Sequence, residues 1–76
     1  MTLDQAVIGS TVQVTGFTTT DANFRRKLLA LGVVPGARLE IRRVAPMGDP
    51  IHIVLQDRSV SLRKSEAAIL EVENQL

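Results

Sequence analysis

The chain has 76 residues, a net charge of +1, no cysteine and 45% hydrophobic residues. This length predicts a single domain spanning residues 1–76, and the lack of cysteine excludes a disulfide framework and a thiolate zinc site. The sequence contains neither a signal segment nor the ~20 apolar residues of a membrane span, so we expect a soluble protein without direct membrane insertion.

Aromatic residues are scarce, and basic residues are concentrated in the middle of the chain. All nine Lys and Arg residues lie within residues 25–64, a stretch that contains only three acidic residues. This distribution predicts either a polarised surface or solvated faces whose charges pair locally. The nearly neutral total charge and the presence of only two Phe, with no Tyr or Trp, argue against nucleic acid as the partner.

The N-terminal part of the chain predicts a loose entry followed by a strand. Leu3, Ala6 and Ile8 are compatible with a helical turn or an irregular segment. Residues 11–15 then alternate polar and apolar side chains, which is the period of a strand. Gly16 is expected to end this strand or to form a bulge.

One α-helix is predicted over residues 22–31. Asp21 is its expected N-cap, because a carboxylate there accepts hydrogen bonds from free N–H groups. The residues on its core face are Phe24, Leu28 and Leu31. Leu29 lies off this stripe, and Gly32 is expected to end the helix in a left-handed conformation.

Alternating apolar residues between turn signals predict four more strands. They span residues 38–45, 51–55, 59–62 and 69–72. Val34-Pro35-Gly36-Ala37 is typical of a type II turn before the first of them. A bulge or the end of the strand is expected at Arg42-Arg43, and a single helical turn over residues 63–68 is expected before the last strand.

Five short strands with one helix inserted after the first predict a mostly β fold. The arrangement that fits best is a small SH3-like barrel of about five strands. An open α+β sandwich is the alternative. The barrel is favoured because every strand is short and the links after the first hairpin are tight.

The sequence offers little material for catalysis. Its only histidine, His52, occupies an outward strand position with no nucleophile and orienting acid in register. The glycines match neither a phosphate loop nor a dinucleotide fingerprint, so we expect no enzyme activity and no cofactor. His52 is a weak candidate metal ligand with Asp49, Asp57 or Glu40, and a solvent-facing strand histidine is the plainer interpretation.

Protein binding is the remaining class. Leu29, Met47 and the outward-facing Val54 are apolar residues without an evident core role. Apolar side chains rimmed by arginines are typical of interfaces, although single exposed ones are common. The predicted partner-binding residues are Arg25, Arg26, Leu29 and Met47.

Three segments in order carry a family resemblance. They are RKLLALGVVPG at residues 26–36, APMGDPI at residues 45–51 and LRKSEA at residues 62–67. Together they resemble the ferrous iron transport protein A (FeoA-like) family. The chain differs from the simplest family pattern in its longer loop at residues 18–20 and in Asp57-Arg58, where many members carry a glycine.

The resemblance implies an SH3-like fold, a cytoplasmic location and an accessory, regulatory role in bacterial ferrous iron transport. The implied partner is the membrane ferrous iron permease, bound at its cytosolic guanine-nucleotide-binding domain. Similar SH3-like domains end iron-dependent repressors. The alternative is therefore a metal-sensing or metal-carrying regulatory domain that uses His52.

Overall fold

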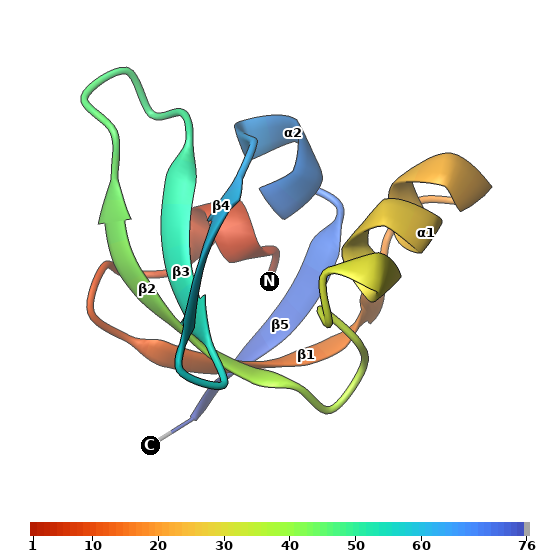
Figure 1. Cartoon of the computed structure of the whole chain (residues 1–76), viewed down its shortest axis with the longest axis horizontal. Helices are drawn as coiled ribbons and strands as arrows, with labels where there is room; N and C mark the ends of the chain where they lie inside the picture. The colour runs from red at the N-terminus through yellow and green to blue at the C-terminus, as the bar shows by residue number, and fades with distance from the viewer. Residues whose placement is uncertain (76) are drawn as a thin grey trace.

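The computed structural model describes residues 1–75 (Figure 1). Five strands form one antiparallel sheet in the order β4-β3-β2-β1-β5. The strands are β1 (Thr11–Phe17), β2 (Arg38–Val44), β3 (Ile51–Leu55), β4 (Arg58–Leu62) and β5 (Leu70–Gln75). The helix α1 (Ala22–Ala30) follows β1, the short α2 (Lys64–Ala67) precedes β5, and a 3-10 helix η1 (Leu3–Gln5) begins the fold. The predicted five strands and the helix inserted after the first are confirmed.

The sheet curls around an aliphatic core to which every strand contributes (Figure 1). Its buried members are Leu3, Val12, Val14, Leu28, Val33, Leu39, Ile41, Ile51, Ile53, Leu55, Leu62, Ala67, Leu70 and Val72. Within each strand these residues alternate with more exposed ones, because successive side chains point to opposite faces of a sheet. The period-2 pattern of the sequence therefore becomes one inner face.

A bulge is present at both positions where the sequence predicted either a bulge or the end of a strand. The register of β1 against β5 shifts between Val14 and Gly16, and that of β2 against β3 shifts between Ile41 and Arg43. A bulge bends the strand that carries it, and these two bends help a small sheet to curl. The last strand is longer than predicted, because β5 continues to Gln75. Its polar residues at 73–75 pair with the start of β1 through the backbone, so their sequence shows no apolar alternation that would predict a strand.

The ends of α1 follow local sequence signals. The Asp21 carboxylate accepts the N–H of Asn23 at 2.9 Å. At the other end Gly32 has φ +91°, and the N–H groups of Gly32 and Val33 donate to the carbonyls of Leu29 and Leu28, each at 3.0 Å. This pair of bonds is a Schellman ending, which satisfies carbonyls that the helix leaves free.

The entry segment combines the two predicted alternatives, a short helical turn followed by an irregular loop. The 3-10 helix stops at Gln5, and Ile8 is 56% exposed. Leu3 reaches the core, whereas Ile8 lies in the loop that leads to β1. Within residues 1–75, no helix has both the length and the hydrophobicity needed to cross a membrane.

Candidate functional site

The outer face of α1 gathers three of the four predicted partner-binding residues. A shallow hollow there is lined by Arg25, Arg26 and Leu29 together with Ala22. Burial of Leu28 on the opposite side of the helix turns these side chains outward, and Leu29 is 42% exposed. In the part of the chain that the structure describes, neither guanidinium forms an ion pair.

Met47, the fourth predicted residue, lies elsewhere. It is in the loop between β2 and β3 and is 90% exposed. Figure 1 shows this loop and α1 on opposite sides of the molecule. A partner that binds a flat surface at α1 therefore does not contact Met47. A partner that contacts both α1 and Met47 must reach across the whole domain.

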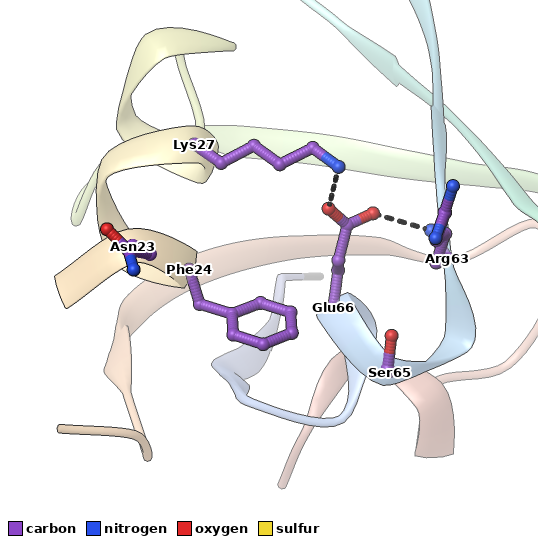
Figure 2. A pocket seen from close by; sticks show the side chains of 6 residues that line it. All are labelled: Asn23, Phe24, Lys27, Arg63, Ser65 and Glu66. Carbon is purple, nitrogen blue, oxygen red and sulfur yellow. Dashed lines mark hydrogen bonds and ion pairs between the residues drawn. The ribbon is translucent and has the colours of Figure 1, made fainter. Parts of the chain in front are cut away.

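A second hollow lies between α1 and α2, and its centre is an ion pair (Figure 2). The Lys27 Nζ atom is 2.8 Å from Oε2 of Glu66. The other carboxylate oxygen of Glu66 accepts the backbone N–H of Arg63 at 2.8 Å. Glu66 is only 3% exposed, whereas Lys27 reaches it from the surface. The carboxylate thus joins the two helices.

The environment of Glu66 keeps it ionised. Burial by itself raises the pKa of this carboxyl, since a charge loses its hydration. The hydrogen bond and charge of Lys27, with the Arg63 N–H, act in the opposite direction and prevail. The pKa of Glu66 therefore lies below its ordinary value.

Phe24 contributes to this hollow instead of the core. It was predicted on the core face of α1, yet it is only half-buried, and within residues 1–75 it is not among the side chains packed against the core cluster. In Figure 1 the beginning of α1 extends away from the curled sheet. Its ring instead lines the space beside Glu66 (Figure 2).

The remaining lining residues are polar or charged. They are Asn23, Ser65 and Arg63, which together with Phe24, Lys27 and Glu66 line an open space of about 220 Å³. The sequence prediction missed this site, although one signal pointed to Glu66. A Glu three residues after the N-cap is the pattern of a capping box, in which its side chain reaches back to the N-cap N–H.

A further polar contact ties the β2–β3 loop to α2. The Asp49 carboxylate accepts the backbone N–H of Lys64 at 3.1 Å. The loop that carries Met47 is thereby held against the helix that carries Glu66.

The surroundings of His52 are basic. Its ring Nδ1 is 3.1 Å from the Ser61 hydroxyl on the neighbouring strand. The hollow beside it is lined by Arg42 and Arg43. In the described residues 1–75, no group of three His, Cys, Asp or Glu side chains is arranged to hold a metal ion. Two nearby guanidinium groups oppose the approach of a cation.

Comparison with known proteins agrees with the fold and the sequence motifs. The model of the FeoA domain family matches residues 1–74. An FeoA-like protein from Clostridium acetobutylicum is 42% identical with a TM-score of 0.91, and the match covers 100% of this chain and 87% of that one. Stenotrophomonas maltophilia FeoA in complex with zinc is described as an SH3 domain protein. It is 28% identical with a TM-score of 0.81, covering 96% of this chain and 89% of that one.

A curated relative joins such a segment to a transporter. The Fe(2+) transport protein A/Fe(2+) transporter FeoB fusion protein of Porphyromonas gingivalis is 40% identical over 70 residues. The match covers 92% of this chain but only 8% of the fusion protein.

Metal-dependent repressors share the fold. A manganese-dependent transcriptional repressor in complex with manganese has a TM-score of 0.90 at 18% identity, covering 99% of this chain and 36% of that one. At this identity the likeness shows the fold alone. The predicted SH3-like fold is confirmed by the Stenotrophomonas structure, and the predicted family by the model match. This chain belongs to the FeoA domain family.

Proposed function

We propose that this chain is a non-enzymatic accessory protein of bacterial ferrous iron transport, and that it regulates the membrane ferrous iron permease by binding its cytosolic guanine-nucleotide-binding domain. The outer face of α1, with Arg25, Arg26 and Leu29, is the proposed contact surface.

The fusion protein is the observation that carries this proposal. In that relative, a segment 40% identical to this chain shares one polypeptide with a Fe(2+) transporter. Joining two modules keeps them at high effective concentration, so a contact between them forms without a separate encounter. A separate chain of the same family then needs a surface that recognises the transporter.

The outer face of α1 has the chemistry of such a surface. An exposed leucine next to two arginines combines an apolar anchor with groups that form paired hydrogen bonds to carboxylates. Arginine is enriched among the residues that dominate binding energy. These side chains are free of internal ion pairs within residues 1–75, so binding would not have to break one.

Calorimetric titration tests the proposal. The protein is titrated into full-length permease in lipid nanodiscs and separately into the isolated cytosolic domain, each with GDP and with a non-hydrolysable GTP analogue. Saturable binding to both preparations supports the proposal, and a difference between the nucleotides identifies a sensor of nucleotide state. Binding to the full-length permease alone moves the contact to its membrane portion and overturns the assignment to the cytosolic domain. Binding to neither overturns the accessory role.

A further inference from the structure

We propose that the pocket between α1 and α2 receives a carboxylate side chain of a partner protein together with a neighbouring aromatic side chain of the same segment. This pocket is the hollow described above, lined by Asn23, Phe24, Lys27, Arg63, Ser65 and Glu66. The proposal rests on the proposed function for the identity of the partner, whereas the recognition chemistry follows from the pocket.

The size of the pocket indicates side chains as its occupants. Its volume of about 220 Å³ is below the ~300–1,000 Å³ of pockets that enclose small-molecule ligands. One aromatic ring with an adjacent acidic group is of the right scale. Pockets that accept such anchors are where binding energy concentrates in protein interfaces.

The charge around the pocket favours an acidic occupant. The Lys27 ammonium has three N–H donors, and its ion pair with Glu66 leaves donors for a second acceptor. The exposed side chain of Arg63 provides a guanidinium at the same pocket. Across α1 and residues 63–67 there are five basic side chains against one acidic side chain, while the whole chain has a net charge of only +1.

Among the described residues 1–75, Glu66 is the only acidic one that lines the pocket, and its charge is already compensated. One of its oxygens faces Lys27 and the other accepts the Arg63 N–H, and the residue is almost completely buried. An incoming carboxylate therefore meets the outer side of Lys27 and Arg63 before it meets Glu66. The pair also holds Lys27 in place, which reduces the entropy lost when a second acceptor binds.

Phe24 supplies the apolar half of the site. Phe24 is one of only two aromatic residues in the chain, and its partly buried ring lies beside the buried Glu66 carboxylate instead of in the core. Two aromatic rings in offset or edge-to-face contact gain about 0.5–1.5 kcal/mol beyond the area they bury. Asn23 and Ser65 at the same pocket add neutral hydrogen-bonding groups that can orient the occupant.

Three small probes separate the two halves of the recognition. The complete ¹⁵N-labelled chain is titrated with 3-phenylpropionate, which carries a ring and a carboxylate, and changes in amide chemical shift are recorded. The matched controls are 3-phenylpropionamide, which lacks the charge, and propionate, which lacks the ring. We expect 3-phenylpropionate to shift the amides of Asn23, Phe24, Lys27 and Ser65, and each control to bind at least about twofold more weakly.

Two matched variants locate the site. Arg63→Gln removes a charge at the pocket and keeps the backbone N–H that donates to Glu66. We expect this variant to bind 3-phenylpropionate about two- to fivefold more weakly than wild type. Arg42→Gln removes an exposed charge on β2 and should leave binding unchanged. Equal binding of the acid and the amide, shifts away from the pocket, or no shifts up to the solubility limit of the probe would overturn the proposal.

The probe assay contains no permease, so its failure does not depend on the proposed function. If the probes bind as expected and the permease does not, the pocket serves a different acidic partner. If the permease binds and the probes do not, docking uses the outer face of α1 without this pocket.

Discussion

Lys27 and Glu66 are 39 positions apart in sequence, and their side chains meet with Nζ 2.8 Å from Oε2. This contact joins α1, which follows the first strand, to α2, which precedes the last. It is asymmetric, since Glu66 is almost completely buried and Lys27 is largely exposed. The buried Glu66 carboxylate needs Lys27 to neutralise its charge and has only one other partner within residues 1–75, the Arg63 N–H. The exposed Lys27 ammonium can be hydrated by water if the pair is broken.

Removal of the lysine should therefore be costly. Lys27→Met keeps much of the side-chain length but leaves Oε2 of Glu66 buried without its cation. We expect the free energy of unfolding, measured by urea denaturation at neutral pH, to fall by about 1–3 kcal/mol. The control Arg26→Met changes an exposed residue on the outer face of α1 and should stay within about 0.5 kcal/mol of wild type. Equal stability of the two variants would show that the pair contributes nothing.

The same pair predicts a dependence of stability on pH. The folded pKa of Glu66 is below its unfolded value, so the stabilising contribution is complete above the unfolded value of about 4.3 and is lost as the pH falls through the folded pKa. The difference in unfolding free energy between wild type and Glu66→Gln should be largest near neutral pH and shrink in this acidic range. Thermal unfolding of both proteins at a series of pH values measures this difference. A difference that does not change with pH would contradict the lowered pKa of Glu66.

Gly32 combines a left-handed backbone with a close neighbour. A Cβ there would lie 2.8 Å from the Arg58 Nη2 atom, which itself donates to the Leu31 carbonyl at 3.0 Å. Gly36 has a similar φ of +93° with no atom within 4 Å of its Cβ position. We expect both Gly36→Val and Gly32→Val to lose roughly 1–2 kcal/mol from backbone strain, and Gly32→Val to lose more because Arg58 must move. Equal melting temperatures for the two variants would show that the contact has no effect.

Charge reversal on α1 tests the docking surface without disturbing the core. Arg25→Glu combined with Arg26→Glu should weaken binding to the permease at least about tenfold, since paired guanidinium groups at a docking face become repulsive. The matched control is Arg42→Glu with Arg43→Glu, which makes the same change of net charge on β2. If calorimetry gives equal affinities for both double variants, the weaker binding is caused by the change in net charge and not by loss of this surface. Circular dichroism checks that each variant folds.

His52 distinguishes the accessory protein from a metal-sensing or metal-carrying domain. Because Arg42 and Arg43 line its hollow, we expect the His52→Ala variant to bind zinc or ferrous iron no more weakly than wild type. Competition with a chromophoric chelator measures this affinity. A loss of about tenfold or more would favour the metal-binding alternative.

Local sequence signals were sufficient for most of the fold. Asp21 before the helix, Gly32 after it and the proline-glycine pair at residues 35–36 each act through the conformation of neighbouring residues. Alternation of apolar residues likewise predicted the inner faces of the strands. These features involve contacts a few residues apart, so a linear sequence contains the information needed to predict them.

The candidate site needed more than local signals. The same helical periodicity placed Leu28 and Phe24 on one face, but Leu28 is buried in the core whereas Phe24, at the start of α1, is only partly buried. In Figure 1 this start of α1 extends away from the sheet. The outward direction of Arg25, Arg26 and Leu29 was predictable from that face. The separation of Met47 from them was not, because it depends on how the β2–β3 hairpin is placed relative to α1.

The sequence alone determined the order of the elements, the turns, most of the core and the family motifs, since these depend on local conformation and hydrophobic period. The tertiary structure decided that Lys27 meets Glu66 and that Phe24 lines a pocket beside them. Such contacts depend on where folding brings distant segments, and a charged or aromatic side chain has the same local preferences whether or not a partner faces it. The chemistry proposed for this pocket is therefore a property of the folded chain.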